Sequence, residues 1–194
     1  CLAHPSWSGP LGTGRWREQE ATALAPLHLV EVYNSHSDPD ADTAVWHAVA
    51  RARGLRAPVW ASAGDDAHHR SPDDHDCAWV MARLPERSAA ALEHALRSGA
   101  FYPTTGPLVH FGASGDTVEV HVARPEEDVE IRFIDAASAL RAVCNGRRAA
   151  YICRGDEGFV RVEVLDRRGT SRGKGRAVVI KAWSQPFWLI EAAG

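Results

Sequence analysis

The chain has 194 residues, of which 45% are hydrophobic and 24% are charged, so it can bury a core and lacks the composition of a disordered protein. Twenty-two Lys and Arg against 25 Asp and Glu leave a net charge of -3, which offers no general attraction for nucleic acid or an anionic membrane. No apolar run approaches the roughly 20 residues of a membrane-spanning helix. We therefore expect a soluble, cytoplasmic protein without nucleic-acid or membrane partners, and a signal peptide upstream of Cys1 is left open.

The first residues indicate a piece of a longer protein. Met81 is the only methionine, and the chain begins at Cys1 inside an apolar segment, Cys1-Leu2-Ala3, that is typical of a strand end. A sheet that lacks its first strands has an unpaired edge through which two copies can associate. The sequence therefore predicts a fragment that forms a homodimer.

Residues 1–103 alternate short apolar runs with helical patterns. Buried strands are predicted at 27–33, 57–63 and 77–84, and helices at 41–53 and 87–97. Gly54 and Gly99 follow the two helices directly and are typical of helix C-caps. Strands that alternate with helices predict a parallel sheet.

Residues 104–194 follow a different periodicity, with short alternating strands separated by turn residues. Strands are predicted at 117–122, 129–133, 159–164, 177–183 and 187–190. No helical stretch is long enough to connect parallel strands, so the pattern predicts an antiparallel β-sandwich. The Gly-rich loop at 169–175 precedes no helix and is predicted to be a solvated hairpin tip rather than a phosphate loop.

Candidate metal ligands follow two of the predicted strands. His4 emerges directly from the first apolar segment, and Asp66 and His68 follow the strand at 57–63. Residues two apart in an extended segment point the same way, so Asp66 and His68 can present oxygen and nitrogen to one cation. Asp65 is one residue out of phase with Asp66 and His68, so it is expected either to support a metal ligand or to act as a capping group. On the residues alone, a hydrogen-bonded structural His4 and an ordinary polar loop remain open.

Four further residues are candidates for supporting or substrate-binding roles. Glu31 lies in an apolar strand where an unpaired carboxylate is costly, so we expect either a contact that supports a metal ligand or an edge position. Asn34 follows that strand and either orients a substrate or forms an Asx-turn. His69 and Arg70 follow the Asp66-x-His68 pair, where they either contact a phosphate oxygen or lie in a solvated loop.

Seven segments together resemble the PHP-type metal-dependent phosphoesterases, in the branch that also contains carbamate-hydrolase-like enzymes. They are, in order, LAHPSW, VEVYNS, WHAVARARG, SAGDDAHH, AWVMARL, ALRSGAFYPTTGP and AWSQPFWL, and they span most of the chain. The resemblance implies the C-terminal part of a distorted (β/α)7 barrel in residues 1–103, followed by an antiparallel β-sandwich-like domain in residues 104–194. It also implies that His4, Asp66 and His68 are metal ligands in a site with two or three divalent ions.

The same family opens with a His-x-His pair followed by further Asp, His and Glu ligands, which this chain lacks, so we expect an incomplete site. Mixed imidazole and carboxylate ligands suit Zn, Mn or Fe. The expected function is a metal-dependent hydrolase that acts on a small phosphoester through a metal-bound hydroxide, without a further catalytic residue assigned. Carbamate or ester hydrolysis is the alternative chemistry. The other class of function is an inactive barrel remnant whose β-sandwich serves as a binding module.

Overall fold

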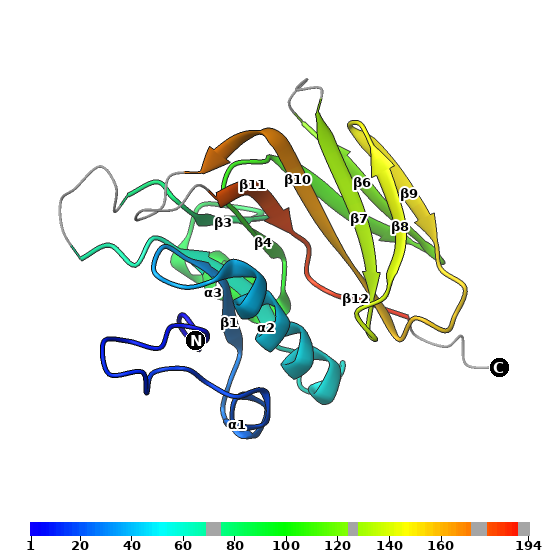
Figure 1. Cartoon of the computed structure of the whole chain (residues 1–194). Helices are drawn as coiled ribbons and strands as arrows, with labels where there is room; N and C mark the ends of the chain where they lie inside the picture. The colour runs from blue at the N-terminus through cyan, green and yellow to red at the C-terminus, as the bar shows by residue number, and fades with distance from the viewer. Residues whose placement is uncertain (69–74, 124–127, 172–177, 190–194) are drawn as a thin grey trace. The chain divides into compact units, whose positions relative to one another are not determined.

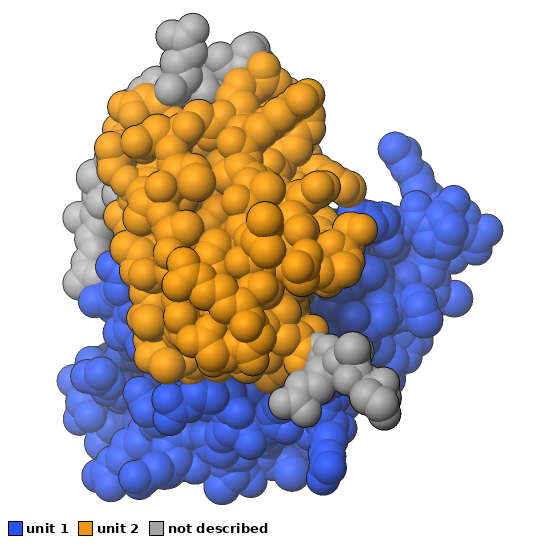
Figure 2. Space-filling view, turned by 90° about the vertical axis from the view of Figure 1, so that its right-hand side faces the viewer, with its two compact units in different colours: residues 1–104, 172–178 blue, residues 105–171, 179–194 orange. Residues whose placement is uncertain are grey.

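The computed structural model describes residues 1–68, 75–123, 128–171 and 178–189 (Figure 1). The chain forms two compact units, coloured in Figure 2: unit 1 is residues 1–104 with a short piece that ends at Val178, and unit 2 is residues 105–171 and 179–194. The fold is mixed α/β, and antiparallel pairing dominates. Over the described residues the strands form open sheets and no closed barrel. In the same residues, no helix combines the length and apolar character needed to cross a membrane.

The helices lie in unit 1. Its elements, in chain order, are α1 (Glu18–Ala23), β1 (Leu29–Asn34), α2 (Pro39–Arg53), β2 (Trp60–Gly64), β3 (Trp79–Ala82), α3 (Ala89–Ser98) and β4 (Phe101–Thr104). The later strands are β5 (Val109–Ser114), β6 (Thr117–Val122), β7 (Val129–Asp135), β8 (Leu140–Asn145), β9 (Arg148–Ile152), β10 (Phe159–Ser171), β11 (Val178–Trp183) and β12 (Phe187–Trp188).

The first strands of unit 1 are parallel, as the sequence predicts. β1 pairs with β2 from Leu29 opposite Trp60 to Asn34 opposite Gly64. On the other side of β1, Leu2 forms an isolated parallel bridge with Val30, and its N–H donates to the carbonyl of Leu29 at 2.8 Å. The carboxyl ends of β1 and β2 therefore lie side by side.

Helix α2 connects β1 to β2 and packs its apolar face into the core. Asp38 caps it by accepting hydrogen bonds from the N–H groups of Asp40 and Ala41, and Gly54 ends it at a φ of 61°. Trp46 is fully buried on this face, and its indole N–H donates to the carbonyl of Val59 at 3.1 Å. The predicted helix at 41–53 is confirmed and begins two residues earlier.

The prediction of a parallel β3 is wrong, because β3 pairs antiparallel with β4, from Trp79 opposite Thr104 to Ala82 opposite Phe101. Along the chain, helix α3 follows β3 and precedes β4. The six residues 83–88 can span about 20 Å when extended. A ten-residue helix is ~15 Å long, so this link can carry the chain away from β3 by the length of α3. The helix then returns the chain to the end of β3, where β4 begins. Gly99, at a φ of 75°, ends the helix and turns the chain into β4.

Unit 2 consists of two antiparallel sheets. In the first, the neighbouring strands of this unit are β11, β10, β7 and β8, in that order, with β12 also paired to β10; the other sheet has the order β5-β6-β9. The side chains of Val118, Val120 and Val122 on β6 are buried, whereas the residues between them are more exposed. Phe133 of the first sheet stacks on Tyr151 of the second at 5.5 Å between ring centroids. The two sheets thus contact each other through this stacked pair of rings.

The turn after β9 is organised by the buried carboxylate of Glu157. It accepts hydrogen bonds from the Tyr151 hydroxyl at 2.7 Å, the Arg154 N–H at 2.8 Å and the Gly155 N–H at 2.9 Å. Burial opposes ionisation, but the hydrogen bonds outweigh it and lower the pKa of Glu157 from 4.5 to about 2. Because the folded pKa is lowered, this stabilisation is present above about pH 4.5 and is lost as the pH falls towards 2.

Replacing Glu157 by glutamine is expected to lower the free energy of unfolding by about 2 kcal/mol at pH 7, since a neutral amide makes weaker bonds to the same donors. Thermal unfolding of the parent and of Glu157→Gln between pH 7 and pH 3 measures this difference. The two curves should converge as the pH falls below 4.5. A difference that stays constant over this range would show that the charge of Glu157 is not the source of stability.

Candidate metal centre

The register of the parallel pair brings two loops together. Asn34 at the end of β1 lies opposite Gly64 at the end of β2. His36 is two residues beyond the first of these positions, and Asp66 is two residues beyond the second. The hydroxyl of Ser35 donates to the carbonyl of Asp65 at 2.5 Å and ties the loops directly. His36 and Asp66 therefore face each other across the carboxyl ends of the strands.

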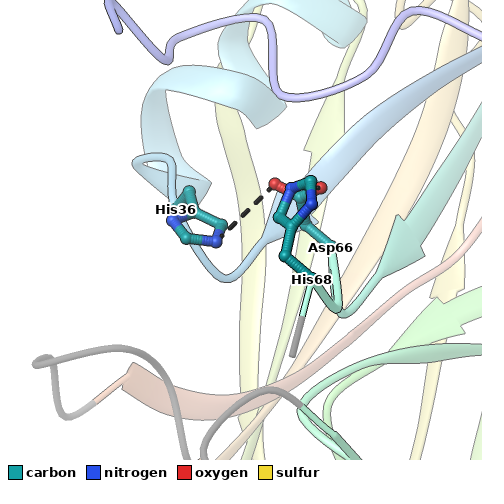
Figure 3. Close-up of side chains that lie close together, drawn as sticks. All are labelled: His36, Asp66 and His68. Atoms are coloured by element: carbon teal, nitrogen blue, oxygen red, sulfur yellow. Dashed lines mark ion pairs between the residues drawn. The ribbon is translucent and has the colours of Figure 1, made fainter. Parts of the chain in front are cut away.

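Three side chains converge at this place (Figure 3). Asp66 Oδ1 lies 3.1 Å from His68 Nε2, and Asp66 Oδ2 lies 3.8 Å from His36 Nε2. One potential ligand atom from each residue lies within 4.8 Å of the others. The side chains of His36 and Asp66 are about one-quarter exposed and that of His68 is 64% exposed, so the cluster opens to solvent on the His68 side. Asp66 has a φ of 52°, a left-handed conformation that Asp adopts more readily than most residues.

Asp65 secures the loop that carries these ligands. Its carboxylate accepts hydrogen bonds from the backbone N–H groups of Cys77 and Ala78 at 2.8 Å and of Asp76 at 2.9 Å. The chain beyond the ligand pair is thus held against the residue that precedes Asp66. Asp65 is a supporting group, in keeping with its position out of phase with the ligand pair.

Asn34 and Glu31 form a hydrogen-bonded support beneath the cluster. Asn34 is buried, accepts a bond from the His36 N–H at 2.9 Å and donates to Glu31 Oε2 at 3.0 Å. Both ends of the amide are therefore used to shape the turn that presents His36, as an Asx-turn does. Burial raises the pKa of Glu31, against the lowering effect of its bonds from His4 and Asn34. The charge of Asp66 raises it further.

His4 lies beside this support and outside the group of three converging ligands. The backbone N–H of His4 donates to Glu31 Oε2 at 2.7 Å, and the His4 ring makes an edge contact with Trp7 at 5.1 Å between centroids. Its Nδ1 is buried and has no hydrogen-bond partner among the described residues. The structure thus links His4 to the cluster through Glu31, which interacts with both His4 and Asp66.

Sequence reasoning missed His36. The sequence does contain a signal for it. His36 lies two residues after Asn34, the last residue of β1, just as Asp66 lies two residues after Gly64, the last residue of β2. The structure brings together Asp66 and His68, which were predicted, and adds His36. The remaining predicted substrate contacts, His69 and Arg70, lie outside the described residues.

The donor set selects the type of ion. Two imidazole nitrogens and one carboxylate oxygen suit Zn, Mn or Fe, whereas Ca²⁺ prefers a shell of oxygens. Structural zinc sites usually close with four protein ligands, and catalytic sites usually use three with one position open. The three ligands that converge among the described residues, with His68 exposed, therefore fit a catalytic ion better than a structural one.

No family model matches the chain, and neither the curated proteins nor the solved structures contain a match.

Proposed function

We propose that the chain is part of a metal-dependent hydrolase related to the PHP-type phosphoesterases, and that residues 1–103 are the C-terminal part of its distorted (β/α)7 barrel. The observation that supports this most directly is the convergence of His36, Asp66 and His68 at the carboxyl ends of two parallel strands. Reactive groups of α/β enzymes collect at this end of the sheet.

The residues of the cluster and its surroundings have different roles. His36, Asp66 and His68 would hold the divalent ion. When bound, such an ion lowers the pKa of a water towards 7 and offsets the negative charge that develops on a phosphoryl group. Asp65 fixes the backbone on both sides of the Asp66-x-His68 pair. Asn34 sets the turn of His36.

His4 and Glu31 complete the site at its buried side. Glu31 is held by the His4 backbone and by Asn34, so its carboxylate is fixed in place. The buried Nδ1 of His4 remains available for a hydrogen bond or a ligand bond. The family resemblance implies that His4 is a metal ligand, and in this position it would serve a second ion beside the cluster.

The reaction class is tested with 4-nitrophenyl phosphate, with 4-nitrophenyl acetate as the ester comparison, on the full chain supplied with Zn²⁺ or Mn²⁺. Because the sequence predicts an incomplete site in this chain, the expected result is slow turnover of the phosphoester that a chelator abolishes and that Asp66→Ala reduces at least 100-fold. His94→Ala, which changes an exposed histidine of α3, should leave the rate unchanged.

Three other outcomes are distinct from this one. Turnover that survives both the chelator and Asp66→Ala would overturn the metal-dependent mechanism. Turnover of the acetate alone would replace the phosphoesterase with an esterase at the same centre. Metal-loaded protein without turnover of either substrate would favour the non-enzymatic alternative, in which unit 2 is a binding module.

A further inference from the structure

Asp42, in the first turn of α2, has a carboxylate whose two oxygens are bonded to two different loops. Its Oδ1 accepts a hydrogen bond from the backbone N–H of Ser6 at 2.7 Å, and its Oδ2 accepts one from the hydroxyl of Ser37. The Asp42 side chain is fully buried. A buried carboxylate without partners is costly, so the fold favours the positions of the two loops that keep both bonds.

Each of these loops carries a histidine of the candidate site. Ser6 lies two residues after His4, and Ser37 directly follows His36. A backbone that is held at Ser6 and at Ser37 restricts how far either histidine can move from the other. One side chain, that of Asp42, therefore helps to set the position of His4 relative to His36.

Helix α2 is a firm support for these two bonds. The N–H of Asp38 donates to the Ser6 hydroxyl at 3.0 Å, which adds a second link between Ser6 and the start of the helix. The Asp38 carboxylate caps the same helix. Further along, the Trp46 indole donates to the carbonyl of Val59, just before β2. The helix that carries Asp42 is thus fixed relative to the strand that leads to the ligand pair.

Glu31 of β1 joins the same two segments from the side of the strand. Its carboxylate accepts hydrogen bonds from the His4 N–H at 2.7 Å and from the Asn34 amide at 3.0 Å. A single tie leaves a segment free to pivot about it, whereas a second tie from the side of the helix removes that freedom. Without Asp42, the histidines would remain in the site but would no longer be held at one fixed separation.

The surroundings of Asp42 do not allow it to act on a substrate. Its side chain is buried, and both of its oxygens accept hydrogen bonds from the protein. Burial raises the pKa of Asp42, against the lowering effect of the bonds from Ser37 and Ser6. The contacts therefore point to a group that positions the loops rather than to an acid or base that touches the substrate.

We propose that Asp42 is a positioning residue of the metal centre, which holds His4 at its place beside the cluster of His36, Asp66 and His68. The inference rests on the proposed function, in which His4 and the cluster serve ions of one site. Asp42 acts through the two loops and binds no ion itself.

The test compares Zn²⁺ affinity with stability in variants of the full chain. Asp42→Ala should weaken Zn²⁺ binding about ten-fold, in line with the loss of an outer partner of a metal ligand. Asp42→Asn should restore most of this affinity, since its amide can accept from the Ser6 N–H and donate to the Ser37 hydroxyl. Val49→Ala is the matched control, because it leaves a cavity beside the same helix, away from its first turn. It should lower the urea midpoint of the metal-free chain and leave the Zn²⁺ affinity unchanged.

The histidine ring signals in nuclear magnetic resonance spectra of the metal-free chain give a readout that a merely structural role would not move. Asp42→Ala should shift the ring signals of both His4 and His36. Ser37→Ala removes one tie and keeps the carboxylate, so it should shift mainly the signals of His36. Val49→Ala should leave both sets of signals in place.

Two results would overturn the positioning role. One is a Zn²⁺ affinity and ring signals that are the same in Asp42→Ala as in the parent. The other is a loss of affinity that Val49→Ala reproduces at an equal loss of stability. If the parent binds no Zn²⁺, the proposed function fails, while the ring signals still decide whether Asp42 positions the two histidines. Ser37→Ala decides the same question if Asp42→Ala does not fold.

Discussion

Replacing Asp66 by alanine is expected to weaken Zn²⁺ binding at the cluster of His36, Asp66 and His68 at least 100-fold, which is about 3 kcal/mol. The reason is that Asp66 is the charged member of the three converging side chains and faces both histidines, at 3.1 Å from His68 and 3.8 Å from His36. Metal content after dialysis, together with a Zn²⁺ titration, measures the change.

Variants of the neighbouring histidines sharpen this result. His36→Ala and His68→Ala should each weaken the same ion, because each removes one of the three converging ligands. His4→Ala should have a smaller effect on it, since His4 is not one of the three converging ligands and its hydrogen bond to Glu31 comes from the backbone N–H, which alanine retains. Equal metal content in Asp66→Ala and the parent would remove the ligand assignment, and with it the proposed function.

Replacing Glu163 by glutamine is expected to give the largest loss of stability, about 3–5 kcal/mol. Glu163 is 5% exposed and is shared by Arg161 at 2.6 Å and Lys181 at 3.0 Å. Burial opposes its ionisation, but the two cations outweigh burial and lower the pKa of Glu163 to about 2. Glutamine would leave both buried cations without the carboxylate that they share.

Urea denaturation at pH 7 measures this loss as a lower midpoint at an unchanged slope. The matched control is Glu93→Gln on α3, whose exposed pair with Arg97 should contribute less than about 0.5 kcal/mol. Since the pKa of Glu163 is lowered, its contribution is present above about pH 4.5 and falls away towards pH 2. Similar midpoints for Glu163→Gln and Glu93→Gln would show that the buried cluster adds no net stability.

The sequence predicted the elements whose apolar pattern is strong. The strand at 117–122 matches β6 at both ends, and Gly54 and Gly99 end the two longer helices as predicted. The missed elements α1, β4, β5, β8 and β9 have weak or broken apolar patterns; β8, for example, exposes Leu140 and Val143. The predicted direction of β3 was wrong. Strand direction depends on how far the link at 83–88 can reach, and the spacing of apolar residues carries no information about that reach.

The candidate site was predicted in part for a similar reason. Asp66 and His68 lie on one segment, so their spacing could be read along the chain. His36 comes from another loop, and its position depends on the register of β1 with β2. His4 follows an apolar segment as Asp66 does. Its backbone N–H, however, donates to Glu31 and its ring contacts Trp7, so it lies outside the cluster. Pairing between strands, rather than spacing within one, decides which imidazoles meet.

The carboxylate of Asp65 has an evolutionary consequence. It clasps the backbone of Asp76, Cys77 and Ala78, so the stretch that leaves the ligand pair is gathered back beside its own starting point. An insertion or deletion between His68 and Asp76 would leave these hydrogen bonds and the order of the three converging side chains unchanged. This part of the loop can therefore vary in length and sequence during evolution while His36, Asp66 and His68 keep their places.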